Sequence, residues 1–446
     1  MMNTPICDFV AAYDHSSPLR LHMPGHKGMA VLGPEGRDIT EVDGADVLYS
    51  AQGIIRQSEE NAAHLFGTGL TLYSAEGSSL SIRAMLYLIS LYAKESGKRP
   101  LILAGRNAHK VFITGAALVD IDVQWLFSKE SGSVVCCPLD LSQVEERLIR
   151  EQPAAVYVTS PDYLGNVADI RTLSDLCHRH GALLAVDNAH GAYTHFLPVS
   201  MHPMDLGADL CSDSAHKTLP VLTGGAYLHI SKDAPALLRD HAENALSLFA
   251  STSPSYLILQ SLDAANRYLA DGYSKKLAAM TERLNALRND LAAYGYEVIS
   301  GEPMKLTLGT KAIGWHGDEL ADHLQGYGVV CEFADPDFVV MMFTPEISHE
   351  AVDALLALLL SVEKHEPIAE KPPVLAIPEA RMRPREALFS LQESIPVSQA
   401  QGRVLAAASV TCPPAVPVVV CGEVIDETAV SCFRYYGIER CFVVKE

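Results

Sequence analysis

Residues 212–220 read Ser-Asp-Ser-Ala-His-Lys-Thr-Leu-Pro, which places Lys217 among small hydroxyl residues, a histidine and a proline. Lys217 is the only lysine or arginine between Arg179 and Lys232, and apolar segments lie on both sides of it. A lysine that contributes only to solubility usually lies on a charged, exposed face of the protein. We therefore expect Lys217 to be semi-buried and to take part in chemistry.

A carboxylate precedes this lysine in the sequence. Asp187 ends the apolar run 182–186, which is typical of a buried strand. Open parallel sheets bind ligands beyond the carboxyl ends of their strands. Pyridoxal 5'-phosphate (PLP) needs such a pair, because a lysine forms the Schiff base and an acid keeps the ring nitrogen protonated. Taken alone, Asp187 would equally suit a helix cap or a surface loop, and Lys217 is what favours the catalytic interpretation.

Length and composition limit the class of protein. A chain of 446 residues favours two or three domains, and 48% hydrophobic with 20% charged residues fits a globular fold. The sequence has neither a run of eighteen uncharged apolar residues nor a basic, apolar leader, so we expect a soluble cytoplasmic protein without membrane association. The ten cysteines lack zinc spacing and are expected to be reduced thiols, with no metal site. A net charge of −20 argues against nucleic-acid binding.

Apolar and helical segments alternate between about residues 70 and 270, which predicts an α/β fold with a mostly parallel sheet. The predicted strands are 101–104, 123–127, 154–159, 183–186 and 226–230, and the predicted helices are 78–92, 141–150 and 170–180. A long helical stretch at 255–294 leads to a smaller β-α-β-β-α unit. We expect an N-terminal segment 1–30, a major domain 31–271, a small domain 272–366 and a C-terminal domain 373–446 that packs on the rest.

A candidate phosphate loop lies at 76–79, Glu-Gly-Ser-Ser, between a strand-like segment and a helix. Amide groups at a helix start, together with the two hydroxyls, suit a phosphate. This signal is weak alone, because serine at a helix start is commonly only an N-cap. The glycine and lysine patterns of dinucleotide and P-loop sites are absent from the sequence.

Together these motifs resemble the PLP-dependent ornithine, lysine and arginine decarboxylases. The matching motifs follow one another in family order: H-x-P-G-H-K-G at 22–28, the phosphate loop at 76–79, R-N-x-H-K at 106–110, S-P-x-Y-x-G at 160–165, D-x-A-H-G at 187–191, S-x-H-K-T-L at 214–219, T-S-P-S-Y at 252–256, and a C-terminal proline motif from Pro413 or Pro414 to Gly422 and Glu423. The resemblance covers about residues 20 to 427.

The resemblance implies a fold-type-I PLP-dependent transferase fold, similar to aspartate aminotransferase, with a smaller α+β domain and a C-terminal extension. It implies Lys217 as the Schiff-base lysine, Asp187 as the partner of the pyridine nitrogen, His109 stacked on the ring and His190 near the reacting groups. Gly77, Ser78, Ser79, Ser214 and His216 are implied around the phosphate. The implied activity is decarboxylation of arginine, lysine or ornithine to an amine of polyamine biosynthesis by a homodimer, with arginine first because the compact form resembles the biosynthetic arginine decarboxylases.

The sequence departs from the family pattern at several acids and amides. Asn188 stands where an acid is common, and Glu76 should repel a phosphate unless it points away. Asp162 alters the fourth motif, and Asp162 and Glu423 are the acids that we expect near a substrate cation. Three alternatives stay open: an aminotransferase or another PLP lyase, a non-catalytic regulator with the PLP fold, and a structural interpretation of every motif as caps and turns.

Overall fold

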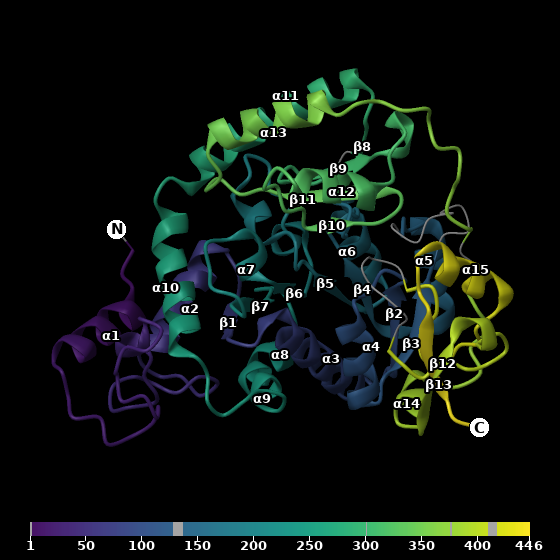
Figure 1. Cartoon of the computed structure of the whole chain (residues 1–446). Coiled ribbons are helices and arrows are strands. Elements are labelled where there is room, and N and C mark those ends of the chain that lie inside the picture. The colour runs from purple at the N-terminus through teal and green to yellow at the C-terminus, as the bar shows by residue number, and fades with distance from the viewer. Residues whose placement is uncertain (1, 128–136, 300, 375–376, 409–416) are drawn as a thin grey trace. The chain divides into compact units, whose positions relative to one another are not determined.

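The computed structural model describes residues 2–127, 137–299, 301–374, 377–408 and 417–446 (Figure 1). Contacts between residues divide the chain into two compact units. The first unit holds residues 1–100, 152–156 and 170–275, and the second holds 101–151, 157–169 and 276–446. The chain therefore passes between units several times, and the consecutive boundaries expected from the sequence stay a prediction. The predicted motif at Pro413 or Pro414 begins outside the described residues.

The first unit is built around strands that lie in the order β1-β7-β6-β5-β4. Their bounds are β1 Leu70–Ser74, β4 Pro153–Thr159, β5 Leu183–Asp187, β6 Leu210–Asp213 and β7 Ala226–Ile230. The helices are α1 Pro5–His15, η1 Glu35–Arg37, α2 Ile54–Leu65, α3 Gly77–Ser96, α6 Ile170–Arg179, η2 Ala192–Phe196, η3 Pro203–Leu206, α7 Ala215–Thr218, α8 Ala236–Asp240, α9 Ala242–Ser247 and α10 Tyr256–Ala270. The strands predicted at 154–159, 183–186 and 226–230 are confirmed, as are the helices at 78–92 and 170–180.

The pairing of β5 with β6 decides which side chains meet. The two strands are parallel, and Asp187 is aligned with Ser212. Strand β7 runs antiparallel to both β6 and β1, so the parallel arrangement ends at β6. Parallel strands bring their carboxyl ends to one edge of a sheet. Residues that follow β5 and β6 therefore lie beside one another.

The second unit contains a parallel strand pair and a separate antiparallel sheet. The pair is β2 Arg99–Gly105 with β3 Asp122–Leu126, and the four-stranded sheet has the order β10-β11-β9-β8. The remaining elements before the C-terminal segment are α4 Lys110–Val119, α5 Leu141–Glu151, α11 Tyr273–Tyr294, β8 Glu297–Ile299, β9 Lys305–Gly309, η4 Lys311–Ile313, α12 Gly317–Gln325, β10 Phe333–Ala334, β11 Phe338–Met342 and α13 His349–Ser361. Figure 1 shows α11 and α13 running side by side, and Arg283 of α11 binds Asp353 of α13. The predicted β-α-β-β-α order is confirmed, although the strand expected at 329–333 is reduced to β10.

The C-terminal segment packs into the core of the second unit, as expected from its short, proline-broken apolar runs. Its elements are α14 Pro384–Leu388, β12 Gln392–Pro396, η5 Val397–Gln399, α15 Glu427–Tyr435 and β13 Arg440–Val444. Val397, Phe433 and Val443 share one hydrophobic cluster with Phe127 and Val340. Within the part of the chain that the structure describes, no helix is long and apolar enough to cross a bilayer.

A buried ion pair joins the C-terminal segment to the loop after β2. Arg106 donates to both carboxylate oxygens of Glu423 at 2.6 and 2.7 Å, and also to the carbonyls of Pro417 and Val418. The Arg106 side chain is fully buried and that of Glu423 is 4% exposed. A buried charge that loses its partner is strongly destabilising, because desolvation is then uncompensated.

We expect Glu423→Gln to lower the free energy of unfolding by roughly 3–5 kcal/mol, the usual range for breaking a buried ion pair. Urea unfolding followed by circular dichroism measures this change. The matched control is Glu146→Gln, which removes the exposed partner of Arg150 and should change the unfolding free energy by less than about 1 kcal/mol. Equal losses in the two variants would contradict the structural role of the Arg106–Glu423 pair.

Candidate active site

Lys217 lies in the short helix α7, directly after β6. Its amide donates to the carbonyl of Ser214 at 3.0 Å, and its Nζ lies 3.1 Å from Nε2 of His190. His190 is buried, whereas Lys217 is exposed in the single chain. The expectation of a semi-buried lysine is therefore wrong for this chain by itself. The contact brings together two residues that the family motifs assign to the site, and their roles toward a cofactor stay a prediction.

Asp187 is the last residue of β5 and is 2% exposed. Its Oδ1 accepts the amide N–H of Ala189 at 3.2 Å, so the carboxylate closes the turn that follows the strand. The amide of Asn188 donates to the carbonyl of Ser212 at 3.0 Å, which extends the β5–β6 pairing by one residue. Asp187 and Lys217 are thus each placed by the ends of adjacent strands.

The candidate phosphate loop opens helix α3. Gly77 has a φ of +71°, which side chains rarely adopt, and a Cβ built there would have only Cε1 of His216 within 4 Å, at 3.9 Å. Ser214 donates its hydroxyl to that of Ser78 at 2.6 Å. The Nδ1 of His216 lies 2.9 Å from the carbonyl of Gly225 and must carry a proton to bond it. The predicted residues Gly77, Ser78, Ser214 and His216 therefore gather at one place, and Ser79 follows in the same first turn of α3.

These residues fit the phosphate end and the ring end of PLP. The first turn of a twenty-residue helix presents amides without partners inside the helix, and the residue before it, Glu76, does not cap them with its side chain. The hydroxyls beside those amides are a donor set for an anion, and His216 adds a donor at Nε2 when both of its ring nitrogens carry protons. Asp187, at the end of the neighbouring strand β5, is the acidic group that a pyridine nitrogen needs.

Glu76, the extra acid beside this loop, has a partner of its own. Its side chain is exposed and its Oε1 accepts the amide N–H of Ser251 at 2.6 Å. The carboxylate is thus held by the 251 loop. Whether this position keeps the carboxylate away from a bound phosphate stays a prediction.

The two carboxylates expected near a substrate cation are engaged inside the protein. Asp162 accepts the amides of Leu164 and Asn166 through Oδ1 and the Asn166 side chain through Oδ2, and burial raises its pKa. Glu423 pairs with Arg106, as described above. Both acids therefore have partners within the second unit, and their role as substrate ligands stays a prediction.

His109 belongs to the second unit, where it precedes α4. Its Nδ1 accepts the amide N–H of Val111 at 3.3 Å and so caps that helix. In the neutral ring the proton is then on Nε2. Stacking of His109 on a cofactor stays a prediction.

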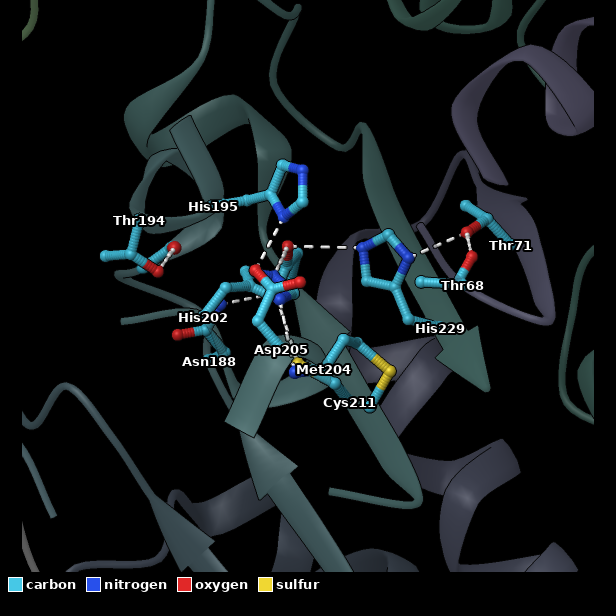
Figure 2. A network of polar contacts seen from close by, with 12 residues as sticks. Thr68, Thr71, Asn188, Thr194, His195, His202, Met204, Asp205, Cys211 and His229 are labelled. Atoms are coloured by element: carbon cyan, nitrogen blue, oxygen red, sulfur yellow. Dashed lines mark hydrogen bonds and ion pairs between the residues drawn. The ribbon is translucent and has the colours of Figure 1, made fainter. Parts of the chain in front are cut away.

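A buried polar network centred on Asp213, the last residue of β6, was not predicted from the sequence. Asp213 Oδ2 lies 2.9 Å from Nε2 of His202 and 3.2 Å from Nε2 of His229, and Oδ1 accepts from Asn188 at 2.7 Å. Figure 2 shows His229 continuing to Thr71 and Thr68. Little in the sequence indicated this network, because its residues come from separate segments of the chain with no fixed spacing between them.

This network also contains a possible ligand set that was not expected from the sequence. The ligand atoms of His202, Cys211 and Asp213 all lie within 4.8 Å of one another. Burial raises the pKa of the Cys211 thiol well above its usual range, with the charge of Asp213 adding to the effect. In the structure a direct hydrogen bond joins His202 and Asp213. A proton thus lies between these two groups at the position where a shared metal ion would bind them.

Comparison with known proteins identifies the family of the chain. The family model for the major domain of Orn/Lys/Arg decarboxylases matches residues 4–295, and the one for their C-terminal domain matches 370–443. The chain belongs to the Orn/Lys/Arg decarboxylase family. It is 29% identical to arginine decarboxylases of Bacillus subtilis and Halalkalibacterium halodurans, covering 96% and 97% of this chain and 92% and 93% of theirs. The lysine decarboxylase structure from Francisella novicida has a TM-score of 0.81 at 16% identity, over 99% of this chain and 81% of that one. The fold expected from the motifs is thereby confirmed.

We expect Lys217→Ala to lose the covalent attachment of PLP, because the family motif at 214–219 assigns the Schiff base to this lysine. Absorbance spectra before and after borohydride, followed by peptide mass spectrometry, measure the attachment. Lys232→Ala, which removes an exposed lysine outside the site, is the control. After borohydride it should carry covalently attached PLP at Lys217, as the wild type does. A borohydride-stable adduct in the Lys217 variant would show that another lysine holds the cofactor.

Proposed function

We propose that this chain uses PLP to decarboxylate a basic amino acid, with arginine as its main substrate. Membership of the Orn/Lys/Arg decarboxylase family supports the reaction. The observation that carries the proposal is the contact of Lys217 with His190, in a chain that matches both the major and the C-terminal domain of the decarboxylases. Arginine is favoured because several relatives that match over nearly their full length are named arginine decarboxylases.

When bound, PLP would supply an electron sink for the bonding pair released as CO₂ leaves the substrate. The first turn of α3, with Ser78, Ser214 and His216, would hold its phosphate group. Asp187 would keep the ring nitrogen protonated through a charged hydrogen bond. The β5–β6 pairing would thus place Asp187 at the ring end and Ser214 at the phosphate end, while α3 supplies the remaining phosphate contacts.

Proton transfer is the task that we assign to Lys217 and His190. At 3.1 Å the two nitrogens are within hydrogen-bond distance, so one proton can pass between Nζ and Nε2. The loss of CO₂ leaves an electron pair at Cα that needs a proton from the protein. A lysine paired with a buried histidine can deliver that proton while water is kept from the histidine.

A mixture of arginine, lysine and ornithine tests the substrate. We expect agmatine and CO₂ to form from arginine faster than cadaverine or putrescine form from the other two, as measured by mass spectrometry of the amines. Preferential formation of cadaverine or putrescine would exclude arginine as the main substrate. Keto acids in place of amines would indicate an aminotransferase, and the absence of any product with PLP bound would indicate a regulator.

A homodimer forms part of the proposal. The loop at residues 19–32 of the first unit exposes apolar side chains, among them Leu19 and Leu21 at 83% and Leu32 at 88%. Clusters of this kind on a protein surface commonly mark an interface. A second copy of the chain is the partner that the family resemblance implies.

Light scattering of the purified protein should give twice the 48.2 kDa mass of one chain. The double variant Leu21→Asp, Leu32→Asp places charges in the loop and should shift the mass toward one chain. A wild-type mass of 48.2 kDa at micromolar concentration would contradict the homodimer.

We also propose that the enzyme is cytoplasmic and that its amine product is used in polyamine biosynthesis. The eight cysteines in the described part of the chain are free thiols, which suits a reducing compartment. Agmatine, the amine that arginine yields on decarboxylation, is a basic amine of the kind that polyamine formation consumes.

A further inference from the structure

Asn188 and Asp213 lie at the ends of adjacent strands, and each is bonded to a predicted cofactor residue. Asn188 follows Asp187, the expected partner of the ring nitrogen, and Asp213 precedes Ser214, which contacts the phosphate loop. Their side chains meet at 2.7 Å, with the amide nitrogen of Asn188 donating to Oδ1 of Asp213. Both side chains are fully buried.

The surroundings of Asp213 require an ionised carboxylate that only accepts hydrogen bonds. The Nδ1 of His202 accepts the amide N–H of Met204, so its proton is on Nε2, which faces Asp213. The Nε2 of His229 faces the same carboxylate oxygen, and the thiol of Cys211 lies 3.4 Å from the other. Burial raises the pKa of Asp213, but the two histidines outweigh this effect and keep the pKa well below its ordinary value.

An ionised carboxylate at 213 restricts the residue that can stand at 188. A carboxylate at 188 would place two acids at hydrogen-bond distance in a buried site, which is strongly unfavourable unless they share a proton. An amide of the same shape supplies the donor instead. The amide at 188, where an acid is common in the family pattern, is thus the residue that Asp213 needs.

We propose that Asn188 and Asp213 form a matched donor–acceptor pair that positions Asp187 and Ser214 at the two ends of the cofactor. The pair adds a side-chain link to the backbone bond between Asn188 and Ser212. Fixing both strand ends sets the spacing between the carboxylate and the phosphate loop. Asn188 and Asp213 are positioning residues, and their role in holding PLP rests on the proposed function.

Exchanging the two residues tests the pair. In the double variant Asn188→Asp, Asp213→Asn the amide at position 213 can donate to the carboxylate at position 188 and accept from both histidines. Only the weak contact of the Cys211 thiol with Oδ1 of residue 213 then loses its acceptor. Asn188→Asp alone should weaken PLP binding by roughly tenfold or more, the effect of one buried hydrogen bond left unmade. The exchanged variant should recover a large part of that loss. Asn61→Asp adds the same charge on α2, beside Asn3, and should bind PLP like the wild type.

The dependence on pH separates the pair from a general packing defect. In Asn188→Asp the two acids can share one proton at low pH, so PLP binding should be closer to normal at pH ~6.5 and worse at pH ~8.5, since the shared proton is lost as the pH rises. The wild type and the exchanged variant, which hold one carboxylate, should lack this extra dependence. The other ionisable groups around Asp213 are the same in all variants: His202, His229, Cys211, Tyr227, Asp187 and Asp205.

PLP titration followed by absorbance, and thermal unfolding without PLP, measure these effects on the purified proteins. Wild-type binding by Asn188→Asp at both pH values would overturn the proposal, as would an exchanged variant that binds no better than Asn188→Asp or fails to fold. A stoichiometric metal ion in the wild type would also overturn it, because metal bonds would replace the hydrogen bonds to Asp213. If the wild type binds no PLP or forms no amine, the proposed function fails, while the unfolding midpoints still report the pairing.

Discussion

The parallel pairing of β5 with β6 is the constraint on which the candidate site depends. It aligns Asp187 with Ser212, and one residue further it brings Asn188 against Asp213. The chain then turns into α7, so Lys217 emerges within one helical turn of the same edge. A shift of the pairing by one residue would turn every side chain of the strand to the opposite face. The backbone hydrogen bonds between β5 and β6 therefore set the relative positions of the site residues that follow these two strands.

Two carboxylates in the described part of the chain show how donors offset the burial of charge. Asp213 accepts from an amide and two imidazoles, and Glu423 accepts two hydrogen bonds from one guanidinium. The cost of taking a carboxylate out of water is offset only when most of its acceptor positions are used. Replacing a single donor in such a cluster is expected to destabilise the protein, because the desolvation free energy of the carboxylate is then no longer offset.

The sequence alone was sufficient for features that are local along the chain. Apolar runs predicted β4, β5 and β7, and Lys217 with Asp187 followed from their positions after such runs. Strand β6 was missed because it has four residues, of which the last two are polar. Its role comes from pairing with β5, and pairing between segments is not visible in the periodicity of either one.

The same limit explains how individual acids were interpreted. Charge at positions 76, 162 and 423 is plain in the sequence, but the donors that engage these acids are Ser251, Asn166 and Arg106, which the sequence does not associate with them. Asn188 is the converse case, since its neutral amide departs from the family pattern while the compensating charge lies 25 residues away. A departure from a motif at a buried position is therefore best judged together with the side chain it contacts, because the desolvation cost belongs to the pair.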